Sequence, residues 1–232
     1  MVLFAWQNIA LMIAGLVNLA MGIFVLKRGW RSKINLYFAS LVFFNFLWSF
    51  FMIGAFSTNN LSLVNFFDKT TNLFGVGIML SLFYFTLYFP YQTDKISSLK
   101  TKLIWFFSIV ISLMIYTKWF VINTIWIEKP FNYISYYNKY GYFIYAVYFF
   151  VLACWSIYFL FKKYRQAEGV AKLQLKRLIL SITVGLICGA YFNLLLNYFG
   201  VFTLGWFGPV FTLFMNIVVF RAIRSPKEKI NG

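Results

Sequence analysis

The sequence of 232 residues contains no histidine, only 5 acidic residues and only 2 cysteines. The lack of histidine excludes catalytic triads and metal sites that depend on imidazole. Cys154 and Cys188 both fall within apolar segments, so no disulfide framework is expected. Charged residues make up 11% of the chain, whereas they form about a quarter of an ordinary globular domain. So few charges could not cover a surface that faces water, which excludes a soluble fold.

The acidic residues avoid the centres of the apolar segments. Charge inside a membrane segment usually marks an ion or proton pathway, so this distribution argues against proton-coupled transport and against a coupling cation. The last apolar segment has no lysine before its end, which excludes a retinal Schiff base. We therefore expect no cofactor and no metal. The five acids are Asp68, Asp94, Glu128, Glu168 and Glu228.

Apolar sequence is abundant, at 62% of the chain, with 24% aromatic residues. A helix needs roughly 20 apolar residues to cross a bilayer, and runs of that kind recur seven times. A transmembrane β-barrel would instead need strands of about 10 alternating residues, which these runs do not show. The prediction is an all-α, integral membrane seven-helix bundle in one domain, residues 1–224, with a short tail, 225–232. The predicted spans cover about residues 2–26, 34–56, 70–89, 103–122, 141–161, 178–199 and 205–220.

Basic residues predict the orientation of these spans, because lysine and arginine favour cytoplasmic loops. Of the 21 basic residues, 17 follow the first, third, fifth and seventh spans, and only Lys69, Lys118, Lys129 and Lys139 lie on the other side. We therefore predict an outside N-terminus and a cytoplasmic C-terminus in the inner (cytoplasmic) membrane. The net charge of +16 then reflects topology and attraction to anionic lipid headgroups, and nucleic acid is not expected as a partner.

Neutral polar residues form a regular series in the sixth span. Gly185, Gly189, Asn193 and Asn197 recur every four residues and so share one helical face. The favoured interpretation is helix packing, because small residues let helices approach and asparagine amides bond across them. The alternative is that the two asparagines line a cavity open to the outside.

A candidate ligand site follows from this alternative. Asp68, Lys69 and Asn72, near the outer start of the third span, would then line the same cavity. The aromatic-rich outside segment 118–140 contains Trp126, and we interpret it as an interfacial belt lying flat, with a ligand lid as the alternative. The candidate ligand-binding residues are Asp68, Lys69, Asn72, Asn193, Asn197 and Trp126.

Buried contacts and a helix bend are expected elsewhere in the bundle. Asn18, Asn45 and Asn216 are predicted to form buried hydrogen bonds. Pro209 lies in the seventh span, where a proline frees a backbone acceptor and bends the helix. The hairpin of the sixth and seventh spans is therefore the candidate signalling lever. The residues expected to serve helix packing or signal relay are Gly185, Gly189, Pro209 and Asn216.

Short motifs near both ends of the chain occur in a characteristic order. Gly208-Pro-Val-Phe-Thr212 stands early in the last span, which exits through Ala222-Ile-Arg224. Near the N-terminus, Asn18-Leu is followed by basic residues at the end of the first span, Lys27 to Arg31. Asn35-Leu-Tyr-Phe38 and Leu47-Trp48 come next, in the second span. In this order and topology, nearly the whole chain resembles the N-terminal seven-helix region of bacterial sensor histidine kinases.

The resemblance implies a sensory input module that relays an external or in-membrane stimulus to a cytoplasmic output domain. That domain is typically a dimerising histidine kinase and sometimes a diguanylate cyclase, so a homodimer is among the expected assemblies. The residues after Ile223 contain no phosphoacceptor histidine and no ATP-binding region, so we expect no enzyme here and an output domain in trans or as a missing C-terminal part. The alternatives are a small-solute or lipid transporter, which the lack of midplane charges and internal repeats disfavours, and a membrane scaffold.

Overall fold

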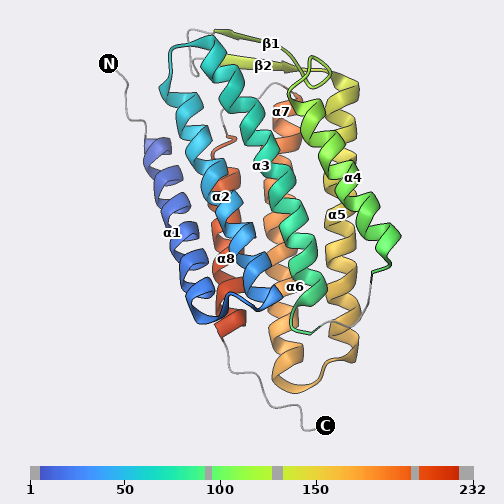
Figure 1. Cartoon of the computed structure of the whole chain (residues 1–232). Helices are drawn as coiled ribbons and strands as arrows, with labels where there is room; N and C mark the ends of the chain where they lie inside the picture. Colours follow the sequence, from blue (N-terminus) through green and yellow to red (C-terminus); the bar gives the residue numbers. More distant parts are fainter. Residues whose placement is uncertain (1–5, 92–95, 127–132, 200–203, 225–232) are drawn as a thin grey trace.

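Among the residues described by the computed structural model, seven helices are long and apolar enough to cross a membrane, and they run side by side (Figure 1). The structure describes residues 6–91, 96–126, 133–199 and 204–224. Helices form because a segment in lipid must satisfy its own backbone hydrogen bonds. The elements are α1 (Trp6–Gly29), α2 (Lys33–Ser57), α3 (Leu61–Tyr88), α4 (Ser98–Ile115), β1 (Val121–Trp126), β2 (Tyr133–Tyr137), α5 (Lys139–Gln166), α6 (Gly169–Ala190), the π-helical turn η1 (Tyr191–Leu195), α7 (Leu196–Tyr198) and α8 (Phe207–Arg224).

Helix α3 is the most buried of the seven and packs against α2, α4, α5 and both strands. Helix α8 packs against α1, α2 and α6. Asn216 of α8 donates a hydrogen bond of 2.8 Å from its amide to the Oδ1 atom of Asn18 in α1. Asn18, Asn45 and Asn216 are all fully buried, as predicted. The seven-helix bundle expected from the apolar runs is confirmed.

The fourth span ends earlier than the predicted 103–122. Helix α4 stops at Ile115, and the side chain of Thr117 stabilises the turn that follows by donating to the Met114 carbonyl (2.7 Å) and accepting from the backbone N–H of Trp119 (3.1 Å). Residues 121–126 are rich in β-branched side chains, which favour a strand, and β1 pairs antiparallel with β2. A small two-stranded sheet is therefore added to the helical bundle.

Two other helices begin earlier than the predicted spans. Helix α3 starts at Leu61 rather than at residue 70, because the Asn60 side chain accepts hydrogen bonds from the backbone N–H groups of Ser62 (2.9 Å) and Leu63 (3.3 Å) and so caps the helix. Asp68 and Lys69 thus lie on a helix and not in a loop. Helix α6 starts at Gly169, within the basic segment ahead of the predicted span, and continues into that span at residue 178.

The two ends of the bundle differ in character. The β1–β2 hairpin lies across one end, which we call the hairpin end (Figure 1). The opposite end, which we call the basic end, carries the connection between α5 and α6 and the last residues of α8. Lysines and arginines are concentrated there, including Lys27, Arg28, Arg165, Lys176, Arg177, Arg221 and Arg224.

Lys163 lies beyond residue 161, where the fifth span was predicted to end, and yet it does not face the water or the lipid headgroups. It lies within α5 and is fully buried. Its ammonium group donates to the carbonyl oxygens of Thr86 (2.8 Å), Leu87 (2.7 Å) and Phe89 (2.7 Å). These carbonyls terminate α3, where a helix has no backbone donors left of its own. Lys163 therefore caps α3 from the neighbouring helix.

Candidate functional site

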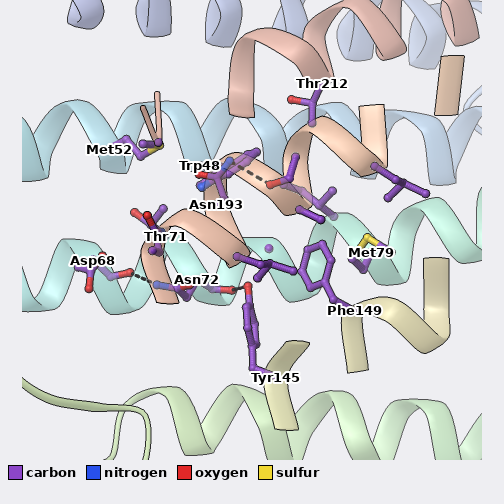
Figure 2. Close-up of a pocket in the computed structure, with 18 of the residues that line it drawn as sticks. Trp48, Met52, Asp68, Thr71, Asn72, Met79, Tyr145, Phe149, Asn193 and Thr212 are labelled. Atoms are coloured by element: carbon purple, nitrogen blue, oxygen red, sulfur yellow. Dashed lines mark hydrogen bonds between the residues drawn. The ribbon is translucent and has the colours of Figure 1, made fainter. Parts of the chain in front are cut away.

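A cavity of about 90 Å³ extends from the hairpin end towards the middle of the bundle, between α2, α3, α5, α6 and α8. Figure 2 shows its lining, in which α3 and the end of the sixth span supply most of the polar groups. Apolar and aromatic side chains complete the walls, so the few polar groups would determine which ligand is bound. The polar lining residues are Asp68, Thr71, Asn72, Asn193, Asn197 and Thr212, and the larger apolar and aromatic ones include Trp48, Met52, Met79, Tyr145 and Phe149.

Four of the six predicted ligand-binding residues line this one cavity, namely Asp68, Asn72, Asn193 and Asn197. Lys69 does not, because successive residues of a helix point about 100° apart, and its ammonium group instead donates to the Tyr116 carbonyl at 3.4 Å. Trp126 is described only by its backbone, which pairs with Tyr133. That these residues bind a ligand remains a prediction.

Asp68 connects the cavity to the hairpin. The Tyr137 hydroxyl in β2 donates to both carboxylate oxygens of Asp68, at 3.3 and 3.2 Å. Burial, with a further contribution from the charge of Asp68, raises the pKa of the Tyr137 phenol well above its ordinary value of 10.0. The phenol therefore keeps its proton and acts as the donor. Tyr133, also in β2, lines the cavity directly, so the β1–β2 hairpin contributes a residue to the cavity wall.

Two residues of this wall were not identified from sequence. The Tyr145 hydroxyl in α5 donates to the backbone carbonyl of Asn72 at 3.1 Å, while the Asn72 amide donates to the Asp68 carbonyl at 2.9 Å (Figure 2). Gly75 makes room for this approach, since a Cβ atom there would lie 2.5 Å from the Tyr145 hydroxyl. The available signal was a tyrosine within an apolar span, because a buried phenol needs a hydrogen-bond partner.

The sixth span changes its winding at the cavity. After Ala190 it forms the π-helical turn η1, in which the Leu196 N–H reaches the Tyr191 carbonyl. The Tyr142 hydroxyl in α5 donates to the carbonyls of Asn193 (2.9 Å) and Leu194 (3.0 Å) within this turn. In a regular α-helix, two residues that are four positions apart point in directions that differ by about 40°. The wider turn rotates less per residue, which keeps Asn193 and Asn197 directed at the cavity.

One polar atom of the lining is unsatisfied. The Oδ1 atom of Asn197 is buried and has no hydrogen-bond partner among the described residues. Buried polar atoms in native proteins normally have a partner in the protein, in water or in a ligand. Asn197 thus presents an acceptor to whatever occupies the cavity.

The residues predicted for packing or relay fall into different environments. At Gly185 a Cβ atom would lie 3.0 Å from Met215, so this glycine allows close packing of α6 on α8. At Gly189 a Cβ atom would meet nothing within 4 Å, and this glycine instead lines the cavity. The expected bend at Pro209 is wrong, because α8 begins at Phe207 and Pro209 occupies its first turn. A helix has no internal partner for the N–H groups of its first turn, so a proline there disrupts nothing.

The family description "N-terminal 7TM region of histidine kinase" matches residues 10–225. The chain belongs to this family. The match includes α1 from residue 10, the whole of the other six spans and every residue that lines the cavity. Such a seven-transmembrane region is the sensory input part of a histidine kinase and not its catalytic part. No curated protein matches the chain.

The lining of the cavity combines a few polar groups with a largely apolar wall. One carboxylate and three carboxamides face a largely apolar cavity, together with the hydroxyls of Thr71 and Thr212. Within the described ranges, no group of three or more metal-ligating histidine, cysteine, aspartate or glutamate side chains occurs.

Proposed function

We propose that this seven-transmembrane region senses a small polar solute that enters the cavity beneath the hairpin, and relays its binding to a cytoplasmic output partner. The observation that carries the proposal is the convergence of Asp68, Asn72, Asn193 and Asn197 on one cavity. The Asp68 carboxylate favours a ligand that donates hydrogen bonds or carries positive charge. The small volume and the aromatic walls favour a compact amine or hydroxyl compound.

The proposed orientation places the hairpin end outside and the basic end in the cytoplasm, in the inner membrane. The concentration of lysine and arginine at the basic end supports it. In this orientation the cavity is accessible from outside, and α8 leads towards the output partner. We further propose a homodimer, because the output domains that follow such regions typically dimerise.

The proposed relay starts with competition for Asp68. A solute that binds the carboxylate displaces the Tyr137 hydroxyl and loosens the hairpin. On the opposite wall, the Asn193 amide lies directly against Gly208 of α8, so a shift of η1 moves α8. A ligand changes such an equilibrium only by its difference in affinity for the two states, and coupling between sites typically amounts to about 1–3 kcal/mol.

Binding is tested with the purified chain in nanodiscs and a panel of small amines, polyols and amino acids, with the melting temperature as the readout. We expect at least one compound to stabilise the parent, and its affinity to fall at least about tenfold in Asp68→Asn, because a charge-assisted hydrogen bond is lost. Lys69→Gln is the matched control, since it changes one charge beside the cavity without touching the lining. Stabilisation by no compound, or equal losses in both variants, would contradict the proposal.

Relay is tested in a chimera in which residue 224 is joined to a histidine kinase output domain. The solute should change autophosphorylation in the parent chimera and have little effect in the Asp68→Asn chimera. A response that is unchanged in Asp68→Asn would show that the cavity does not transmit the signal, even if it binds the solute. Counterflow of solute in proteoliposomes containing only this chain would instead support the transporter alternative.

A further inference from the structure

A second depression, which we call the α6–α8 groove, lies between these helices near the basic end and has a volume of about 530 Å³. Its apolar part includes Leu180, Val184 and Phe214, whose side chains are exposed on the outside of the bundle. Ser181 and Gly185 are small residues, and they leave the groove open between these side chains. Because the spans lie in a bilayer, this groove faces lipid chains.

Positive charge and amide groups lie where the groove reaches the basic end. Arg177 of α6 and Arg221 of α8 line it together with Gln174, and both arginine side chains are exposed. Among the described residues that line the groove, none is acidic. Guanidinium groups bind phosphate oxygens in pairs of parallel hydrogen bonds, and they are less strongly hydrated than lysine ammonium groups. Two arginines on adjacent helices therefore favour a phosphate at this end.

We propose that the α6–α8 groove binds an anionic phospholipid. The phosphate lies between Arg177 and Arg221, and an acyl chain follows Leu180 and Val184 towards the middle of the bundle. A free phosphate would make no use of the apolar part of the groove. A second copy of the chain docking symmetrically through this face would bring like charges together, which opposes association. The groove thus matches a molecule that is anionic at one end and apolar along its length.

The groove shares a wall with the cavity. Gly185 and Met215 line both spaces, and a Cβ atom at Gly185 would lie 3.0 Å from Met215, so α6 and α8 pack closely at this point. Methionine is flexible and readily adjusts to its surroundings. An acyl chain in the groove therefore presses on the wall of the solute cavity, and its presence sets the separation of α6 and α8. This coupling rests on the proposed function, whereas lipid binding itself does not.

Lipid binding is measured by native mass spectrometry, with phosphatidylglycerol and phosphatidylcholine added to the purified chain in the absence of any solute. We expect the parent to prefer phosphatidylglycerol, and the double variant Arg177→Gln/Arg221→Gln to bind it at least about tenfold more weakly, since both guanidinium groups that hydrogen-bond the phosphate are lost. The matched control is Arg165→Gln/Lys176→Gln, which removes two exposed positive charges that do not line the groove. The affinity of this control for phosphatidylglycerol should fall by less than about threefold, as expected when only diffuse electrostatic attraction is reduced.

A third variant, Val184→Trp, fills the apolar part of the groove and keeps every charge. It should also weaken phosphatidylglycerol binding, and inorganic phosphate should not displace the lipid from the parent. Equal losses in the two double variants, unchanged binding in Val184→Trp, or displacement by inorganic phosphate would each overturn the proposal. Thermal melting in phosphatidylcholine nanodiscs checks that each variant is folded. If the arginine variant does not fold, the binding of phosphatidylglycerol to Val184→Trp tests the proposal instead. Because no solute is present in this measurement, its result on lipid binding does not depend on whether the proposed sensing function is correct.

Discussion

At the scale of single residues, Lys163 shows how this bundle accommodates a buried charge. Its ammonium group reaches three carbonyl oxygens at 2.7–2.8 Å, which satisfies all three of its donors. The carboxyl end of a helix also carries partial negative charge, which favours a cation there. The desolvation of the ammonium group is offset in this way, and α5 is joined to the end of α3.

We predict that Lys163→Met lowers the free energy of unfolding by about 2–4 kcal/mol, because methionine fills similar space but leaves the carbonyls of α3 without their donor. The measurement is unfolding of the detergent-solubilised chain by sodium dodecyl sulfate, followed by circular dichroism. Arg165→Met is the control, since it replaces an exposed basic residue of the same helix. Equal stability of the two variants would show that the cap contributes nothing.

At the scale of elements, the π-helical turn is the irregular part of the sixth span. A π turn exposes carbonyls that a regular helix would use internally, and such turns are frequent at functional sites. The Tyr142 hydroxyl donates hydrogen bonds to two of these carbonyls, and the side chain of Asn193 in the same turn lies against α8. The candidate for a movable element is therefore this turn, rather than a bend at Pro209.

We predict that Tyr142→Phe destabilises the turn, because the carbonyls of Asn193 and Leu194 lose their donor at a cost of about 1–3 kcal/mol. Hydrogen exchange of the amides in residues 191–196 should become faster by about tenfold, which corresponds to about 1.4 kcal/mol of local opening free energy. Tyr191→Phe serves as the control, since Tyr191 lies in the same turn and is exposed. Unchanged exchange in Tyr142→Phe would mean that the turn is stable without the phenol.

At the scale of the whole molecule, function depends on which end faces the outside. The cavity and its hairpin lie at one end, and the basic residues and the end of α8 lie at the other. A sensor of external solutes requires the hairpin end to be outside. The proposed lipid site requires the basic end to lie at a leaflet that contains anionic lipid.

Cysteine labelling checks this orientation. In a background with Cys154→Ala and Cys188→Ala, we predict that a membrane-impermeant maleimide labels Lys139→Cys in intact cells and labels Arg165→Cys only after permeabilisation. The two positions lie near opposite ends of α5 and are both exposed. The reverse pattern would refute the proposed orientation, and labelling of both positions from one side would show that α5 does not cross the membrane.

The sequence by itself determined the seven helices and the family. Apolar runs of sufficient length must become helices in a bilayer whatever they pack against, and the order of short motifs indicated the histidine kinase input region that the family match confirms. The spacing along the sixth span also pointed to Asn193 and Asn197. These properties are local, so they can be recognised without knowing which helices are neighbours.

Only the tertiary structure decided which polar groups meet. The hairpin over the cavity, the bond from Tyr137 to Asp68, the cap by Lys163 and the π turn held by Tyr142 each join residues that are distant in sequence. Lys69 stands beside Asp68 in the chain, yet the direction of its side chain keeps it out of the cavity. Hydropathy and spacing do not contain this information, because the partner of a buried polar group depends on which helix faces it at that depth.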